Sequence, residues 1–425
     1  MGMILVVAGL AAFHFLGSQP ETPPLWKNGV SAKIFSDPIS VGENYIFLGG
    51  DKGRKIFKLF AINRQGELAA ESPTLSSFPF PPIVTGDTII LGDSARMIRG
   101  FSLPDLKIKW ESGTMEQFKL PPTKVSEDRF LIQSTKHVLF CLDSQTGKPV
   151  WERSFVDTLV NFAVGKVIVC LHGYTDLKIP QWKATAISPE TGETVWTLTL
   201  PLSHDTPLFV QNICVLSSNE GEIIIVNQND GSVLHKNTVK GLKAVQILDQ
   251  TLVMLAAGGS RVVCMSLMTG SSWSTTLQSG FNGAAKYGER ILLTDKKSLR
   301  CLDVDTGAQF WRRDLANVYN AFPHRRGIFV THKDSFFSRE TYGSYIETGT
   351  GQSTWQAMGR SLFMQPLITN EGDFVISYDG QYRMLPKPAG DNSTYLDSSD
   401  TNGGKHLQMW HQNGESGEKE TKADD

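Results

Sequence analysis

The sequence lacks an excess of charge of either sign. Its 425 residues include 41 lysines and arginines against 43 aspartates and glutamates, which gives a formal net charge of −2. Nucleic-acid-binding surfaces and polybasic membrane patches depend on clustered positive charge. The composition therefore gives no reason to expect a nucleic-acid partner, and its 40% of hydrophobic residues predicts a folded protein with a large core.

Cysteine is scarce and is not paired in sequence. The five cysteines stand at Cys141, Cys170, Cys214, Cys264 and Cys301, so no Cys-x-x-Cys motif occurs. This absence argues against zinc-ribbon and thioredoxin-type proteins. An odd number of cysteines scattered through strand-like segments predicts buried thiols rather than a disulfide framework.

The usual catalytic motifs are also absent. The sequence contains no G-x-x-x-x-G-K-[ST], no H-E-x-x-H and no G-x-S-x-G, and its one G-x-G, Gly349–Gly351, lacks a third glycine. Among the histidines, His204 beside Asp205 and the group His324-Arg325-Arg326 stand out, but no spacing supplies converging partners. We therefore predict no catalytic, cofactor-binding or metal-binding residues, and we expect these histidines to be exposed in loops.

Only one long hydrophobic run is present, and it is short for a membrane span. Gly2–Gly17 contains no charged residue, but a spanning helix needs about 20 apolar residues. No lysine or arginine precedes Lys27, and no Ala-x-Ala site ends the run. We predict a signal peptide or N-terminal anchor over residues 1–17 and a linker over 18–24, with a buried N-terminal strand as the alternative. No cysteine near residues 16–18 could carry a lipid.

The two ends differ from the body of the chain. Residues 389–425 are rich in Asp, Asn, Ser, Gly, Lys and Glu. Such a composition cannot bury enough apolar surface to offset its ordering entropy, which predicts a disordered polar tail. Residues 25–388 have an even composition without a long linker, and we predict that they form one domain.

Within this domain one sequence motif recurs. It consists of a strand with alternating apolar residues, a tight turn that ends in Thr-Gly, and a short strand with tryptophan. The clear copies are LFCLDSQTGKPVW (139–151), ATAISPETGETVW (184–196), VVCMSLMTGSSW (262–273), LRCLDVDTGAQFW (299–311) and SYIETGTGQSTW (344–355). Weaker copies are LFAINRQGEL (59–68), IRGFSLPDLKIKW (98–110) and IIIVNQNDGSVL (223–234). The turn glycines, with Leu106 in one glycine position, are spaced by 40, 41, 45, 39, 39, 37 and 44 residues.

This period predicts an all-β fold. Two further strand-like runs precede each copy, and no comparably strong helical period appears after the N-terminus. Four short strands in about forty residues, repeated around eight times, are typical of a β-propeller with four-stranded blades. The last ordered segment, Gln365–Lys387, holds three strands of a repeat, and Pro24–Val30 with Trp26 could supply the fourth. We therefore expect the N- and C-terminal strands to close the ring.

The recurring residues have physical roles in this fold. Glycine adopts positive φ without steric cost, and the Asp, Asn or Ser four residues earlier can accept bonds from the turn amides. A tryptophan on the outer strand can fill the wedge between blades. The predicted structural repeat residues are Trp110, Gly147, Trp151, Gly192, Trp196, Gly231, Gly270, Trp273, Gly307, Trp311, Gly351 and Trp355.

The repeat phrase resembles that of quinoprotein-like (PQQ-type) propellers. No tryptophan is followed by aspartate, as WD repeats require, and paired glycines are too rare for kelch repeats. Within the superfamily the sequence looks most like the BamB family. That resemblance implies a non-catalytic, periplasmic or envelope-associated scaffold that binds an outer-membrane insertase. It also implies eight blades, which we prefer with one degenerate segment in Pro38–Trp110, although a strict count gives nine.

Two other functions stay open at the level of sequence. A PQQ-dependent oxidoreductase would share the repeat, but such alcohol dehydrogenases typically have adjacent cysteines and a much longer chain. A scaffold or sensor subunit of another membrane complex would also fit the repeat and the hydrophobic N-terminus.

Candidate partner-binding residues lie where the period is broken. Two repeats are long, and their extra residues fall in Leu171–Ala184 and His332–Tyr345. Aromatic, apolar and arginine side chains in such loops are frequent interface anchors, although some could instead continue strands and pack inside their blades. The candidates are Tyr174, Leu177, Ile179, Trp182, Arg325, Arg326, Phe336 and Phe337.

Overall fold

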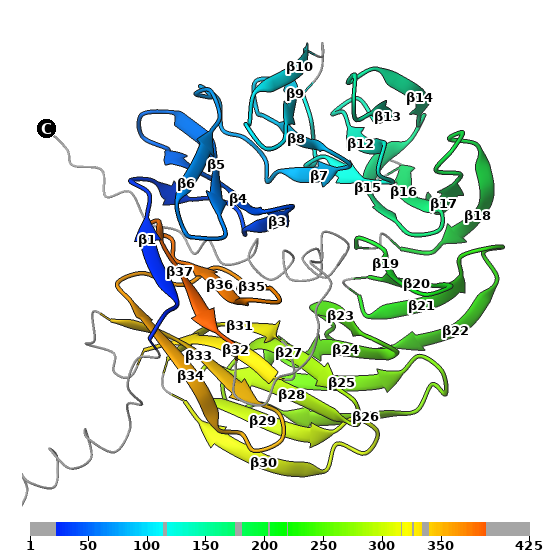
Figure 1. Cartoon of the computed structure of the whole chain (residues 1–425). Coiled ribbons are helices and arrows are strands. Elements are labelled where there is room, and N and C mark those ends of the chain that lie inside the picture. Colours follow the sequence, from blue (N-terminus) through cyan, green and yellow to red (C-terminus); the bar gives the residue numbers. More distant parts are fainter. Residues whose placement is uncertain are drawn as a thin grey trace, which may run out of the picture.

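Nine sheets form a closed ring in the computed structural model, and they follow the chain order around it (Figure 1). The structure describes residues 23–113, 117–174, 181–202, 205–218, 220–315, 317–324, 327–333 and 340–387. These residues contain strands and a single 3-10 turn, Ala257–Gly259. In each blade the strands are called A to D, from the inner to the outer edge of the sheet.

Blades 1 to 3 contain the strands β2 (Lys33–Ile34), β3 (Ile39–Val41), β4 (Asn44–Asp51), β5 (Ile56–Asn63) and β6 (Leu68–Glu71); β7 (Ile83–Thr85), β8 (Thr88–Gly92), β9 (Met97–Ser102) and β10 (Ile108–Gly113); and β11 (Thr123–Lys124), β12 (Arg129–Gln133), β13 (Val138–Asp143) and β14 (Pro149–Ser154). In blade 1, β2 and β3 both pair with β4 and together take the place of strand A.

Blades 4 to 6 contain the strands β15 (Thr158–Val164), β16 (Ile168–Tyr174), β17 (Gln181–Ile187) and β18 (Thr194–Leu200); β19 (Leu208–Val210), β20 (Ile213–Ser217), β21 (Glu222–Asn227) and β22 (Val233–Thr238); and β23 (Ala244–Leu248), β24 (Thr251–Ala256), β25 (Arg261–Ser266) and β26 (Ser272–Thr276). Each of these sheets is an antiparallel meander in chain order.

Blades 7 to 9 contain the strands β27 (Phe281–Tyr287), β28 (Arg290–Asp295), β29 (Ser298–Asp303) and β30 (Gln309–Asp314); β31 (Val318–His324), β32 (Gly327–His332), β33 (Thr341–Glu347) and β34 (Ser353–Gly359); and β35 (Leu367–Ile368), β36 (Gly372–Ile376), β37 (Gln381–Pro386) and β1 (Trp26–Gly29). Strand β1 pairs with β37, with Trp26 opposite Met384, so the chain ends close the ring as expected (Figure 1).

The count of nine blades corrects the preference for eight. The segment Pro38–Trp110, expected to be degenerate, forms two complete blades. Its turn at Leu106 lacks glycine, yet Leu106 takes φ 54° and its N–H still donates to the Ser102 carbonyl at 3.0 Å. Because strands pair through their backbones, a weakened side-chain motif does not remove a blade.

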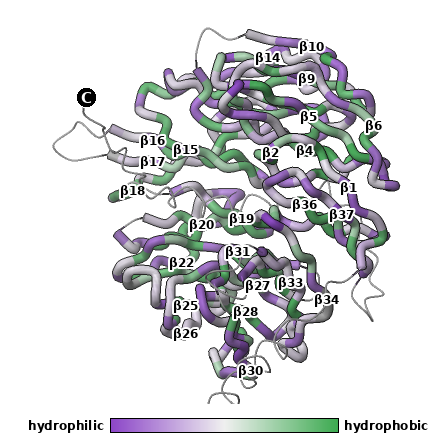
Figure 2. The backbone as a smooth tube through the Cα atoms, turned by 90° about the vertical axis from the view of Figure 1, so that its left-hand side faces the viewer, coloured by the Kyte–Doolittle hydropathy of each residue, from purple (hydrophilic) through white to green (hydrophobic). Residues whose placement is uncertain are grey.

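The core of the ring lies between the blades. The described residues form nine hydrophobic clusters, and each cluster joins two consecutive blades. The B strands are covered by neighbouring blades, so β8 and β32 are buried along their whole length, whereas β22 is exposed along its whole length. In the side view, outer strands such as β30 belong to the hydrophilic segments (Figure 2).

The repeat turn folds through its own side chains. In blade 3, the Asp143 carboxylate accepts hydrogen bonds from the Thr146 N–H at 2.8 Å and the Thr146 hydroxyl at 2.7 Å. Gly147 adopts φ 68°, and its N–H donates to the Asp143 carbonyl at 2.8 Å. Asp303 accepts the same pair of bonds from Thr306 in blade 7, and these bonds lower the pKa of Asp303. Acidic residues in these turns thus have a structural role.

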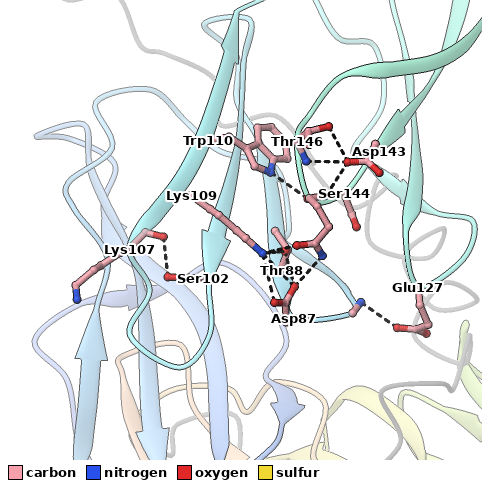
Figure 3. A network of polar contacts seen from close by, with 12 residues as sticks. Asp87, Thr88, Ser102, Lys107, Lys109, Trp110, Glu127, Asp143, Ser144 and Thr146 are labelled. Carbon is pink, nitrogen blue, oxygen red and sulfur yellow. Dashed lines mark hydrogen bonds and ion pairs between the residues drawn. The ribbon is translucent and has the colours of Figure 1, made fainter.

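Tryptophan connects a blade to the next one. The indole of Trp110 packs on the turn glycine of the following blade, Gly147, and its N–H donates to the Ser144 carbonyl at 3.0 Å (Figure 3). The same bond joins Trp151 to Pro189, Trp196 to Gln228, Trp273 to Val304 and Trp311 to Thr348, at 2.7 to 3.0 Å. The matching turn glycines are Gly192, Gly231, Gly307 and Gly351. Trp355 lies in β34, opposite Tyr345.

Candidate protein-binding site

The ring has two faces with different connections. Because every blade is an antiparallel meander and each D strand meets the next C–D turn in the same way, all C–D and A–B turns share one face. All B–C connections share the other face, which we call the long-loop face. Both long connections, between β16 and β17 and between β32 and β33, are B–C connections. The strand ends that flank these connections therefore lie on the same face, on blades 4 and 8.

Two of the predicted partner-binding residues are described by the structure. Tyr174 ends β16 with 37% of its surface exposed, at the start of the long connection of blade 4. Trp182 returns in β17 and is buried in the cluster between blades 4 and 5. Trp182 therefore belongs to a lengthened strand, and its buried indole is not available to a partner. The side chain of Tyr174 is exposed and is available.

The other candidates lie outside the described residues: Leu177, Ile179, Arg325, Arg326, Phe336 and Phe337. The strand ends that flank positions 325 and 326, His324 and Gly327, lie on the face opposite the long-loop face. The strand ends that flank the two long connections lie on the other face of the ring.

His324 corrects the expectation of an exposed loop histidine. It is the last residue of β31 and is fully buried, with Nε2 3.4 Å from the Asp373 carboxylate of blade 9. Its backbone N–H donates to the Tyr287 hydroxyl at 2.9 Å. Its side chain faces the junction of two blades because it stands on an inner strand, so it holds blades 8 and 9 together. His204 lies outside the described residues.

Two further histidines stand at the bases of the long connections, and sequence reasoning did not find them. In blade 4, His172 approaches the Asp157 carboxylate at 3.2 Å and the Thr185 hydroxyl at 2.8 Å. In blade 8, His332 bonds the Ser344 hydroxyl at 2.8 Å. Thr185 and Ser344 stand at the same place relative to their histidines, two residues beyond the directly opposite residue.

The register explains why these positions differ from other blades. Five other blades have Asp or Ser at the equivalent end of strand B: Asp93, Ser134, Ser218, Asp295 and Ser377. Asp295, for example, accepts bonds from the Lys297 and Ser298 N–H groups at 2.8 and 2.7 Å, which closes a short turn. Where the connection is long, a histidine bonded within the sheet replaces this turn cap. An aligned table of the repeats would have revealed this exchange.

Burial governs the protonation of both histidines. It lowers the pKa of His172, although the nearby Asp157 carboxylate acts in the opposite direction. Burial, with a smaller contribution from the charge of Arg313, lowers the pKa of His332 to about 4. Both imidazoles are therefore neutral at pH 7, and they support strand ends rather than present charge.

Other features of the described part of the chain can be stated briefly. No three His, Cys, Asp or Glu side chains come together there as a metal-binding group. None of the helical structure in the same residues is long and apolar enough to cross a membrane. The five cysteines are free and buried, and desolvation raises the pKa of the Cys141 thiol to about 12.

Comparison with known proteins agrees with the repeat and the ring. A family model described as outer membrane protein assembly factor BamB matches residues 23–158 and 181–285, more than half of the chain. No curated protein matches the sequence. Residues 159–180 and those after 285 lie outside the match, so both long connections fall outside it.

Solved structures share the fold at low sequence identity. BamB from Moraxella catarrhalis is 14% identical, with a TM-score of 0.52 over 87% of this chain and all of that one. The computationally designed Ika8 protein is 15% identical, with a TM-score of 0.52 over 74% of this chain and 98% of that one. Sqt1 from Saccharomyces cerevisiae is 9% identical, with a TM-score of 0.50 over 87% and 100%. At these identities the likeness shows the fold alone.

Proposed function

The chain belongs to the family of the outer membrane protein assembly factor BamB, and from this membership we propose that it is a non-catalytic, protein-binding scaffold of the bacterial cell envelope. In this role it supports the assembly of outer-membrane β-barrel proteins by binding an outer-membrane insertase. We place it in the periplasm or attached to the envelope through residues 1–17. The observation that carries the proposal is the family match over most of the first six blades.

The architecture supports a scaffold. Nine blades joined by buried clusters form a rigid body, and the acidic residues of its turns bond their own backbone amides. Binding residues on such proteins are found in loops that a rigid scaffold positions. The two long connections are the segments where this chain departs from its own period, and the strand ends that flank them lie on the long-loop face.

The proposed binding surface is therefore the long-loop face at blades 4 and 8. Tyr174 is an exposed aromatic residue at the base of the first long connection. Counting blades around the ring of nine, the two connections are four blades apart on one side and five on the other. They are nearly opposite each other, so a single partner that contacts both must extend across the centre of the ring.

The test is affinity purification of the tagged full-length protein from gently solubilised native membranes, followed by mass spectrometry. We expect an outer-membrane insertase at near-stoichiometric yield. Replacing residues 175–180 with glycine and serine at equal length, or Tyr174→Ala, should lower this yield about tenfold, as expected when an interface anchor is lost.

Phe310→Ala provides the matched control. Phe310 is also an exposed aromatic residue, but it lies at the start of β30 beside a C–D turn, on the opposite face. Its substitution should leave the yield unchanged. Recovery of a different stable complex, or unchanged levels of barrel proteins after deletion of the gene, would contradict the assembly role.

A further inference from the structure

The tryptophan position of each blade shows how the outer edge of each junction is filled. At six junctions an indole packs on the turn glycine of the next blade, and the residues are Trp26, Trp110, Trp151, Trp196, Trp273 and Trp311. Blade 9 has no C–D turn, because β37 and β1 are its C and D strands. The junctions of blades 1 and 2 and of blades 5 and 6 remain, and they differ from each other.

The junction of blades 1 and 2 is filled by a compensating exchange. Ala70 stands at the tryptophan position of blade 1, opposite Ala61. The residue at the glycine position of the next turn is Leu106, which is completely buried in the cluster between these blades. A side chain from the turn therefore fills the space that the missing indole leaves.

At the junction of blades 5 and 6, neither an indole nor a side chain from the turn fills the outer edge. His235 stands at the tryptophan position, opposite Ile225, and is exposed. The next turn keeps its glycine, Gly270 at φ 72°, and no atom of the described residues lies within 4 Å of a Cβ built there. The neighbouring Met268 is 62% exposed. We call this space, bounded by His235, Met268 and Gly270, the open indole slot.

The other junctions show what this slot is shaped to accept. Each bonded indole donates its N–H to the carbonyl three residues before the turn glycine, which here is the carbonyl of Leu267. The Leu267 N–H donates to the Gln250 carbonyl at 2.8 Å, and no described donor bonds the Leu267 carbonyl. An indole can pack on Gly270, which has no side chain, and donate its N–H to the Leu267 carbonyl. Phenylalanine could pack there but has no N–H to donate.

One tryptophan of the chain lies beyond the described residues. Trp410 follows Leu407 and Met409 in an otherwise polar segment, 23 residues after Lys387. A chain of this length spans up to about 75 Å when extended. A compact body of this size has a radius of gyration of about 21 Å, which corresponds to a diameter of about 55 Å. The segment is therefore long enough to cross one face of the ring and reach the outer edge of blades 5 and 6.

The charges on the C-terminal segment and around the open indole slot do not oppose contact between them. The fifteen residues after Trp410 include five acidic and two basic side chains. Strand β22, which borders the slot, carries His235 and Lys236 and no acidic residue, and the turn Ser266–Ser271 has no charge. Lys236 pairs with Glu222 of the adjacent strand at 2.6 Å, so this strand and turn present no unbalanced negative charge to an acidic segment.

We infer that the indole of Trp410 occupies the open indole slot of its own chain, packing on Gly270 and donating to the Leu267 carbonyl. The C-terminal segment is thereby held against the outer edge of blades 5 and 6. This inference is independent of the partner proposed above, because it concerns a contact within one chain.

The test is amide hydrogen exchange of the full-length protein, read by mass spectrometry. Trp410→Ala should speed exchange in the turn Ser266–Ser271 at least tenfold, because the turn loses the contact that the other turns retain. Exchange in the matched turns that contain Gly147 and Gly307 should not change. Equal exchange in both proteins at the blade 6 turn would overturn the inference.

A second variant separates occupancy of the slot from other effects of the tail. His235→Trp places an indole in the slot from β22 itself, as in the neighbouring blades. With His235→Trp present, Trp410→Ala should have no further effect on exchange in this turn. A persisting effect would overturn the inference, and so would protection that disappears on tenfold dilution, because that would assign the indole to a second copy of the chain.

Discussion

Junctions 4/5 and 5/6 are neighbours built from the same repeat, yet only the first is closed by its own indole. At junction 4/5, Trp196 is buried, packs on Gly231 and donates to the Gln228 carbonyl at 2.8 Å. At junction 5/6, His235 is exposed and Gly270 faces open space among the described residues. Both junctions keep a buried cluster beneath this level. The difference teaches that the apolar cluster holds two blades together, while the indole closes the outer edge.

The largest expected effect is at the closed junction. Trp196→Ala should lower the free energy of unfolding by about 3–5 kcal/mol, because it leaves a cavity and removes a hydrogen bond. His235→Ala, at the same position of the next blade, should change it by about 0.5 kcal/mol or less. Urea unfolding of the two variants measures both values. Similar losses in the two variants would show that the junctions are not different in energy.

Acid should lower the free energy of unfolding through His332 in blade 8, and it should not change the difference between junctions 4/5 and 5/6. Burial lowers the pKa of His332 to about 4, so the unfolded chain binds the proton more readily. The stabilisation is complete above about pH 6.5 and is lost as the pH falls towards 4, by about 2–3 kcal/mol. Urea unfolding at pH 7 and pH 4.5 should show a smaller loss in His332→Gln than in the wild type. Parallel losses would refute the assignment.

The two turn glycines allow a matched pair of substitutions. Gly231 and Gly270 both adopt φ 72°, so alanine strains both backbones by about 1–2 kcal/mol. Only at Gly231 would the new Cβ lie 2.7 Å from the Trp196 ring. In the Trp410→Ala background, which empties the slot, we expect Gly231→Ala to destabilise the protein by about 2 kcal/mol more than Gly270→Ala does. Equal destabilisation in thermal or urea unfolding would mean that a side chain other than Trp410 fills the slot at Gly270.

The smallest expected effect is the repair of the open junction. His235→Trp, made in the Trp410→Ala background, should raise the free energy of unfolding by about 1 kcal/mol, because an indole becomes buried against Gly270. The same substitution at Val233, which stands outside the tryptophan position of β22, serves as the control and should give no gain. A gain from both variants would indicate a general effect of apolar surface.

The repeat turns show how much could be predicted from sequence. Four strands per forty residues and the positive φ of glycines such as Gly147 follow from local patterns, because turns and hairpin pairing involve residues close in sequence. The ring closure through Trp26 joins the two ends of the chain, and it was predicted because the last repeat lacks its fourth strand. A strict count of repeats gives the nine blades observed. The preference for eight came from family precedent, and the structure corrected it.

The candidate site was predicted less completely. The long repeats indicated where the period breaks, and the structure places their strand ends on one face. It also buries Trp182 and His324, and it shows His172 and His332 at the bases of the long connections. Sequence could not decide these points, because an alternating strand has two buried faces in a propeller and the pattern does not say which neighbour each side chain meets.

The sequence by itself determined the repeating unit and the residues that form its turns, since these depend on contacts within about ten residues. Only the tertiary structure decided how each junction is filled: by Trp196 between blades 4 and 5, by Leu106 between blades 1 and 2, and by no described side chain at Gly270. The physical reason is that a junction joins side chains about forty residues apart, and whether they fit depends on the shape of both blades.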